Sequence, residues 1–172
     1  MIDDIIITID AQIARVTLNR PQARNALTFG MYQALADLCR QAGSDQDSDD
    51  IKAIIISGAG NKAFAAGTDI GQFTAFKTLQ DGHDYEARIE AVIGTIETCR
   101  VPVIAALHGA VTGGGLVIAA AAHLRLASAD VKIGMPIART LGNCLAVGNL
   151  RRLVALFGDA RVAHMILTAE LL

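Results

Sequence analysis

Two glycine-rich stretches of the chain could present backbone amides to a ligand. The first is AFAAGTD, residues 63–69, and the second is TGGG, residues 112–115, which precedes an apolar run suited to a helix. The first N–H groups of a helix have no partner within it and carry part of its dipole, so they can bind a developing negative charge. Glycine and alanine let the ligand approach those amides. The two stretches therefore suggest an anion-stabilising site built from backbone.

The same small residues have a plainer interpretation, in which they only allow a helix to pack tightly on a strand. Neither stretch matches the well-known phosphate-binding loops. TGGGLV lacks the G-x-G-x-x-G spacing of dinucleotide-binding proteins, and Lys62 in GAGNKAF is not followed by Ser or Thr as in a P-loop. Neither loop is specific when it is taken alone.

Strands and helices alternate along the chain and must position these loops. Apolar and β-branched runs predict strands near residues 4–9, 13–18, 51–57, 103–108, 122–127 and 131–134, the first two forming a hairpin. Helices are expected over 29–43, 81–98, 116–122 and most of 143–170. Strand, glycine-rich loop and helix recur three times, which predicts an α/β fold with covered sheets.

Local signals fix the ends of some of these helices. Thr28 is suited to cap the N-terminus of the first helix, and Gly43 to end it. Asp69 could cap a further helix that begins near Ile70. The acidic stretch SDQDSDD, residues 44–50, is expected to be a solvated loop, because it lacks the glycine and the distal glutamate of a calcium loop.

Composition excludes several classes of protein and of partner. The 172 residues are 52% hydrophobic, which suffices for one domain with a sizeable core over 1–172. A net charge of −2 and scattered basic residues argue against nucleic acid as a partner. Cys39, Cys99 and Cys144 stand singly, which fits reduced thiols and no metal site. An acidic N-terminus and the absence of a run of about 18 apolar residues predict a cytoplasmic protein without a membrane partner.

Three motifs in order give the chain a specific resemblance. VTLNRPQARNALT (16–28), AFAAGTDI (63–70) and HGAVTGGG (108–115) together resemble the crotonase superfamily, the enoyl-CoA hydratase/isomerase family, over essentially the whole chain. The resemblance implies a spiral of repeated ββα units and assembly into trimers or dimers of trimers. It also implies an acyl-CoA thioester as substrate, with coenzyme A carried as part of the substrate and no separate cofactor.

The resemblance also assigns candidate site residues. The oxyanion hole, which stabilises the thioester enolate, would be formed by the backbone amides of Ala66 and Gly114. The coenzyme A site would draw on the segment RNAL, residues 24–27, and on the backbone of residues 65–70. Its candidate residues are Arg24, Ala26, Leu27, Ala65, Asp69 and Ile70.

The chain departs from the family where the hydratases carry two catalytic glutamates. Val117 takes the first position, and Ile137, or Ala138 in an alternative alignment, takes the second. Neither side chain can transfer a proton, so ordinary hydratase activity would need its acid and base from an unusual residue or from water. The polar groups left near the expected site are Arg139, Thr140, Asn143 and Cys144, each of which also has an ordinary surface, capping or packing role.

Two classes of function follow from this pattern. The first is an enzyme that transforms an acyl-CoA through a stabilised enolate, as an isomerase, a hydratase or a thioester hydrolase. The second is a non-catalytic acyl-CoA-binding or assembly subunit that has lost its acid/base carboxylates. The family's C-terminal helical region is missing from the chain, which ends at Leu172, so a truncated chain is expected.

Overall fold

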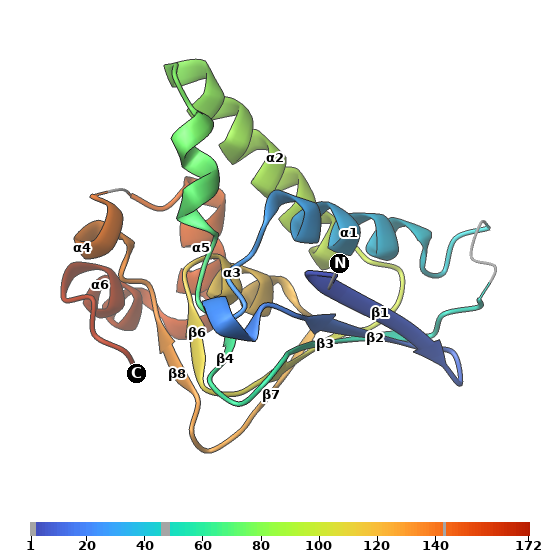
Figure 1. The fold of residues 1–172 in the computed structure, drawn as a ribbon. Coiled ribbons are helices and arrows are strands. Elements are labelled where there is room, and N and C mark those ends of the chain that lie inside the picture. Colours follow the sequence, from blue (N-terminus) through green and yellow to red (C-terminus); the bar gives the residue numbers. More distant parts are fainter. Residues whose placement is uncertain (1–2, 46–48, 143) are drawn as a thin grey trace.

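Two β-sheets form the centre of the fold (Figure 1). The computed structural model describes residues 3–45, 49–142 and 144–172. The larger sheet has the strand order β1-β2-β3-β5-β7, with β1 (Ile5–Asp10), β2 (Ile13–Leu18), β3 (Ala53–Gly58), β5 (Val103–Leu107) and β7 (Leu124–Ala127). The smaller sheet joins β4 (Ala63–Ala65), β6 (Ala110–Thr112) and β8 (Lys132–Gly134). The pair β1 and β2 is an antiparallel hairpin, as predicted, and the other pairs of strands are parallel.

A strand–strand–helix unit repeats three times after the hairpin. The helices are α1 (Phe29–Gln41), α2 (Leu79–Glu97), α3 (Gly114–Ala121), α4 (Ile137–Leu141), α5 (Val147–Phe157) and α6 (Asp159–Leu167), with short 3₁₀ turns η1 (Pro21–Ala23) and η2 (Ile70–Ala75). In the units β3-β4-α2, β5-β6-α3 and β7-β8-α4, the first strand joins the larger sheet and the second joins the smaller one. This repetition confirms the predicted α/β fold of ββα units.

The core lies between the larger sheet and the helices on one side of it (Figure 1). Alternate residues of β2, namely Ala14, Val16 and Leu18, are fully buried, as the two-residue period of a strand requires. The outer strands β1 and β7 are mostly exposed, so the prediction of covered sheets holds only for the central strands.

Caps predicted from the sequence are present in the structure. Thr28 Oγ1 accepts a hydrogen bond from the Met31 amide at 3.3 Å, and α1 starts at the next residue. Asp69 Oδ1 accepts from the Gly71 amide at 3.0 Å at the start of η2. Both contacts satisfy amides that the first turn leaves without a helical partner.

Two strands were not predicted: β4 begins the first glycine-rich stretch, and β6 ends at the first residue of the second. β4 and β6 have three residues each, and their sequences AFA and AVT are too short to show a period. The helical region expected over 143–170 consists of α5 and α6, whereas residue 143 and residues 46–48 of the acidic loop lie outside the described residues.

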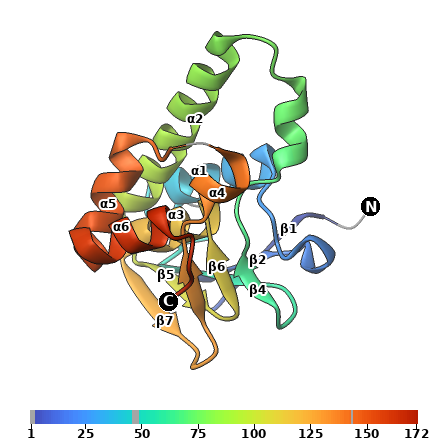
Figure 2. The ribbon, with the colours of Figure 1, turned by 90° about the vertical axis from the view of Figure 1, so that its left-hand side faces the viewer.

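A helical arm rises above the body of the molecule. Figures 1 and 2 show η2 and α2 running side by side, joined at the top of the arm. Its inner surface is aromatic: Tyr85 on α2 packs against Phe73 of η2 at 4.9 Å and Phe29 of α1 at 5.7 Å between ring centroids. These contacts fix α2 relative to the loop that contains AFAAGTD.

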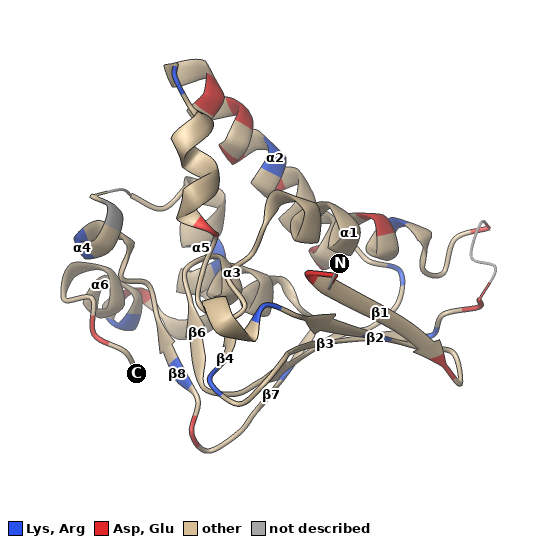
Figure 3. Ribbon diagram, viewed as in Figure 1, with Lys and Arg blue, Asp and Glu red and all other residues tan. Residues whose placement is uncertain are grey.

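Charged residues are distributed unevenly over the elements. Figure 3 shows several acidic positions along α2, whereas lysine and arginine are spread over separate elements. In the described part of the chain, no helix has the length and apolar character needed to span a membrane.

Candidate functional site

A cavity of about 410 Å³ lies where the two glycine-rich stretches meet the arm. One wall comes from the segment after β4, another from α2, and a third from the start of α3. The segment from β8 to α5 completes the enclosure. Residues that the later arguments use are Thr68, Asp69, Tyr85, Glu86, Gly114, Val117, Ile137 and Thr140.

The start of α3 brings Gly114 to the cavity wall. Gly113, with a φ of 53°, turns the chain into the helix, and its own amide donates to the Gly134 carbonyl at 3.3 Å. A Cβ atom on Gly114 would lie 2.1 Å from Tyr32 Oη, which is closer than non-bonded atoms approach. Glycine is therefore required here by close packing, and the Gly114 amide stands in the first turn of the helix.

Ala66 lines the same cavity, but its amide is already engaged. The Ala66 N–H donates to the Arg24 carbonyl at 3.0 Å. The prediction that this amide is one of the oxyanion donors is therefore wrong. The two amides differ because the backbone turns at Gly67, whose φ of 112° changes the direction in which successive amides point.

The amide of Thr68, on the other side of Gly67, lies close to Gly114. Leu27 holds the loop from its other side, since its amide donates to the Gly67 carbonyl at 2.8 Å and its carbonyl accepts from the Asp69 amide at 2.9 Å. The Thr68 nitrogen lies 3.4 Å from the place where a Cβ on Gly114 would stand. Across the described ranges, the Thr68 and Gly114 amides donate to no other residue.

Three hydroxyl groups form a chain beside these amides. Thr68 Oγ1 lies 2.9 Å from Tyr32 Oη and 3.3 Å from Tyr85 Oη. Burial raises the pKa of the Tyr32 phenol well above its ordinary value, and burial likewise raises the pKa of Tyr85. Both phenols are therefore protonated at neutral pH and can donate hydrogen bonds.

Part of the predicted coenzyme A set lies at the cavity. Ala26, Asp69 and Ile70 line it, and the Ile70 side chain is 59% exposed at its rim. Asp69 is held by Arg20, whose Nη2 lies 2.8 Å from Asp69 Oδ2. The hydrogen bond from Arg20 is the main reason why the pKa of Asp69 is below its usual value.

The other predicted coenzyme A residues do not reach this cavity. Leu27 and Ala65 are fully buried in the core. Arg24 instead borders a separate hollow of about 280 Å³ beside Asn25 and Lys62. The sequence motif brings these residues near the site, but their packing separates them from it.

The two positions where the family resemblance implies missing carboxylates present hydrocarbon side chains. These residues, Val117 and Ile137, both line the cavity. Thr140 and Cys144 line it as well, and Thr140 Oγ1 donates to the Pro136 carbonyl at 3.0 Å. Arg139 faces elsewhere, donating to the Ala169 carbonyl at 3.5 Å, and Asn143 is outside the described residues.

Glu86 on α2 is a cavity carboxylate that the sequence reasoning missed. Its helix was predicted, but nothing in the sequence showed that α2 folds over the glycine-rich loops. Tyr85, Glu86 and Ile89 all line the cavity, because Ile89 follows Glu86 by three residues and Tyr85 by four, which are the spacings of neighbours on one helix face. Burial raises the pKa of Glu86, and the nearby charge of Glu90 adds to this effect.

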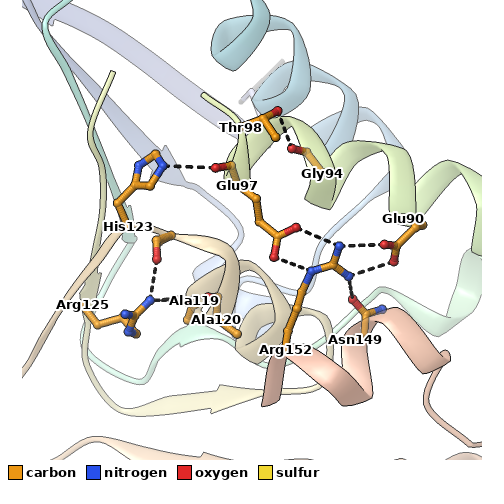
Figure 4. Close-up of polar contacts among 11 residues, drawn as sticks. Glu90, Gly94, Glu97, Thr98, Ala119, Ala120, His123, Arg125, Asn149 and Arg152 are labelled. Carbon is orange, nitrogen blue, oxygen red and sulfur yellow. Dashed lines mark hydrogen bonds and ion pairs between the residues drawn. The ribbon is translucent and has the colours of Figure 1, made fainter. Parts of the chain in front are cut away.

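Arg152 of α5 holds α2 in place (Figure 4). Its guanidinium binds both oxygens of Glu90 at 2.7 and 2.9 Å, and both oxygens of Glu97 at 2.6 and 2.9 Å. It also donates to Asn149 Oδ1, at 3.0 Å, on the cavity wall. The bidentate pairs fix the helix axis beside the site. Among the described residues, no three His, Cys, Asp or Glu side chains gather as metal ligands.

Comparison with known proteins adds independent information. A family model described as enoyl-CoA hydratase/isomerase matches residues 8–172. The chain is 34% identical to a probable enoyl-CoA hydratase of Bacillus subtilis over 96% of its own length and 62% of that protein. It is 32% identical to a short-chain-enoyl-CoA hydratase of Clostridium acetobutylicum over 98% of its own length and 63% of the relative.

Solved structures give the same result. An enoyl-CoA hydratase/carnithine racemase from Magnetospirillum magneticum superposes with a TM-score of 0.89 at 32% identity, covering 100% of this chain and 63% of that one. An enoyl-CoA hydratase from Mycobacterium smegmatis superposes with a TM-score of 0.86 at 26% identity, over 99% and 64% of the two chains. The chain thus spans less than two thirds of the length of each of these relatives.

Proposed function

The chain belongs to the enoyl-CoA hydratase/isomerase family, the crotonase superfamily, and on that premise we propose that it binds an acyl-CoA thioester and stabilises its enolate. The acyl group occupies the cavity of about 410 Å³. The thioester oxygen accepts hydrogen bonds from the amides of Thr68 and Gly114. Coenzyme A passes over Ala26 and Ile70 at the rim.

The observation that supports this function most directly is the pair of amides, of Thr68 and Gly114, for which no acceptor is found among the described residues. Both belong to residues of the cavity wall, and a donor without a partner at such a wall costs free energy unless water or a ligand binds it. One donor of this kind is worth about 3–4 kcal/mol of transition-state stabilisation in a well-studied protease. Two donors on one thioester oxygen make the neighbouring α-proton more acidic, because the enolate that forms carries its charge on that oxygen.

The neighbouring hydroxyl chain supports the same geometry. Tyr32 Oη and Tyr85 Oη both contact Thr68 Oγ1, so the Thr68 side chain cannot rotate without breaking these hydrogen bonds. These contacts tie residue 68 to α1 and α2, which limits the movement of the peptide that carries its amide. Donors that need no rearrangement during the reaction are the most effective.

A non-catalytic acyl-CoA-binding or assembly subunit is the second candidate. The hydrocarbon wall formed by Val117 and Ile137 favours it, because these side chains cannot move a proton. Such a subunit would bind the thioester and polarise its carbonyl without turnover. The two functions therefore share their binding step and differ in the proton transfer.

Calorimetric titration of the full-length protein with butyryl-CoA and with free coenzyme A tests the binding step. We expect the thioester to bind more tightly, since its acyl chain enters the cavity. Ile137→Phe should fill the cavity and weaken the binding of butyryl-CoA more than that of free coenzyme A. The matched change Ile6→Phe on the exposed β1 strand should weaken neither. Equal affinity for both ligands, or no effect of Ile137→Phe, would contradict this placement of the acyl group.

Turnover then separates the two candidates. A panel of 2-enoyl-, 3-enoyl- and 3-hydroxyacyl-CoA thioesters is incubated with the full-length protein, and products are followed by mass spectrometry. Conversion of any member supports the enzyme. Tight binding with no conversion across the panel supports the binding subunit.

A further inference from the structure

We propose that Glu86 is the residue that exchanges a proton with the α-carbon of the bound thioester, in place of the carboxylates that the chain lacks. This assignment rests on the proposed function, because it requires an acyl group in the cavity. It adds to that function a named side chain that can carry out the chemical step. The geometry, the lack of partners and the electrostatic environment of Glu86 support it independently of one another.

The position of α2 places Glu86 at the cavity. Tyr85, the preceding residue, reaches the oxyanion loop through its 3.3 Å contact with Thr68 Oγ1. Ile89, one turn further along, lines the same cavity and is buried. Glu86 lies between these two anchors on the helix and lines the cavity that Gly114 and Val117 also line. A carboxylate from the arm thus shares one chamber with the amide donors.

Glu86 is also free of the contacts that engage its neighbours on α2. Glu90 and Glu97 are both bound by Arg152, as Figure 4 shows. Closer to the start of the helix, Asp81 and Asp84 accept hydrogen bonds from Thr78 and Gln80, respectively. Within residues 3–45, 49–142 and 144–172, the Glu86 carboxylate has no hydrogen bond and no ion pair. A half-buried carboxylate that faces a cavity without a partner is available to a ligand.

Asp69 is the other carboxylate at the cavity, and it is a poorer candidate. Its Oδ2 is paired with Arg20 at 2.8 Å, and its Oδ1 accepts from the Gly71 amide at 3.0 Å. Both contacts stabilise the ionised form and weaken it as a base. The environments of Asp69 and Glu86 therefore shift their pKa values in opposite directions. Opposite shifts of two carboxylates at one site commonly separate a binding role from an acid/base role.

The surroundings of Glu86 raise the pKa of its carboxyl group. Burial is the main cause of its raised pKa, and Glu90 one turn away contributes a like charge that Arg152 partly neutralises. The other titratable groups that line the cavity are Tyr32, Tyr85, Asp69 and Cys144. A carboxylate with a raised pKa is a stronger base in its ionised form than an ordinary surface glutamate.

The proposed step balances without any further reactant. The α C–H bond of the thioester breaks, and its proton forms a bond with a carboxylate oxygen of Glu86. The electron pair of the C–H bond becomes the carbon–carbon double bond of the enolate, while the carbonyl π pair moves onto the oxygen held by the amides of Thr68 and Gly114. In the reverse step Glu86 returns a proton to carbon, and in D₂O it returns a deuteron because its acid proton exchanges with solvent.

Deuterium incorporation tests this step without presupposing hydration or isomerisation. Butyryl-CoA is incubated in D₂O with the full-length protein, and α-deuterium is measured by mass spectrometry at saturating thioester. We expect Glu86→Gln to bind butyryl-CoA within a few-fold of the wild type and to exchange about 10²-fold or more slowly. Asp84→Asn, a matched change from carboxylate to amide on the same helix, should exchange at the wild-type rate.

A pH profile distinguishes proton transfer from a structural role. The wild-type exchange rate should rise with pH as Glu86 ionises and then level off, with a midpoint above the ordinary glutamate value of about 4.3. The residual exchange of Glu86→Gln should lack this midpoint. Glu86→Asp should restore part of the rate.

Each other outcome overturns the assignment in a recognisable way. Equal exchange by the wild type and Glu86→Gln would overturn the role of Glu86 and leave the proposed function standing. Binding without exchange by the wild type would also overturn it, and would favour the non-catalytic subunit. A loss of binding in Glu86→Gln that accounts for the whole loss of exchange would overturn proton transfer as its role. Failure of the wild type to bind butyryl-CoA would overturn the proposed function itself.

Discussion

Replacement of Gly114 by alanine should destabilise the protein through one identifiable contact. The added Cβ would lie 2.1 Å from Tyr32 Oη and 2.9 Å from Thr68 Oγ1. Tyr32 is 1% exposed, so its ring has no free volume into which it can move. Overpacking of this kind costs about 1–3 kcal/mol, and the hydrogen bond between Tyr32 and Thr68 adds about 1 kcal/mol if it breaks. We therefore expect Gly114→Ala to lower the free energy of unfolding by about 2–4 kcal/mol.

A double-mutant cycle tests whether Tyr32 is the cause. Tyr32→Phe removes the oxygen that the new Cβ would meet, so Gly114→Ala should cost about 1–2 kcal/mol less in that background. Free energies come from urea unfolding followed by circular dichroism. The control is Gly94→Ala in α2, where a Cβ would meet nothing within 4 Å. Because alanine has the higher helix propensity, this change should raise the free energy of unfolding by about 1 kcal/mol. If Gly114→Ala unfolds like the wild type, or if the two substitutions are additive, the packing described at the start of α3 is wrong.

The other predictions concern catalysis, the arm and assembly. Val117→Glu combined with Ile137→Glu should raise the hydration of crotonyl-CoA, measured by the loss of its enoyl absorbance, by about 10²-fold or more, and an unchanged rate would show that other groups limit the site. Arg152→Met should lower the free energy of unfolding by about 2 kcal/mol at pH 7. Arg152 lowers the pKa of Glu90, so the stability that this pair contributes is present above the unfolded-state glutamate pKa of about 4.3 and is lost as the pH falls through the folded-state pKa. Urea unfolding midpoints of the wild type and Arg152→Met at pH 7 and pH 3 test this, and an equal loss of stability at both pH values would contradict it. The full-length protein should form trimers or dimers of trimers by light scattering, and a monomer would contradict this assembly. Leu126→Lys on the exposed face of β7 should reduce that mass, and an unchanged mass would contradict a role of β7 in the interface.

The sequence predicted those features that depend on local chemistry. Thr28 and Asp69 act as caps because a short side-chain oxygen satisfies a nearby amide in either protein or peptide. Strands with a continuous apolar and β-branched run, such as β3, were predicted to within a few residues because that pattern is also local. The order of three motifs was enough to identify the family, whose model matches the chain from residue 8 to 172.

Features that depend on the direction of a peptide group were not predictable. Ala66 and Thr68 lie two positions apart in one motif, and the backbone turn at Gly67 separates the amide that donates to Arg24 from the one for which the described residues supply no acceptor. The three-residue strands β4 and β6 were missed because their pairing partners are supplied by distant segments. Propensity in so short a segment carries little weight against tertiary pairing.

Glu86 was missed because its role depends on packing between remote elements. The positions near the glycine run where the resemblance implies carboxylates are Val117 and Ile137. Glu86 precedes Gly113, the first glycine of that run, by 27 positions (113 − 86) and reaches the cavity only because α2 folds back over it. The clue that the sequence did contain was a carboxylate next to an aromatic residue on one helix, which is too common to be specific.

Infrared spectroscopy of a bound thioester tests the central claim most directly. Butyryl-CoA labelled with ¹³C at its carbonyl is bound to the full-length protein, and the isotope-edited difference spectrum isolates that carbonyl stretch. If the amides of Thr68 and Gly114 both donate to the oxygen, the stretch moves to lower frequency than in free butyryl-CoA, and it does so in Glu86→Gln as well, because the backbone donors are unchanged. A carbonyl that binds with the frequency of the free thioester would contradict the oxyanion site.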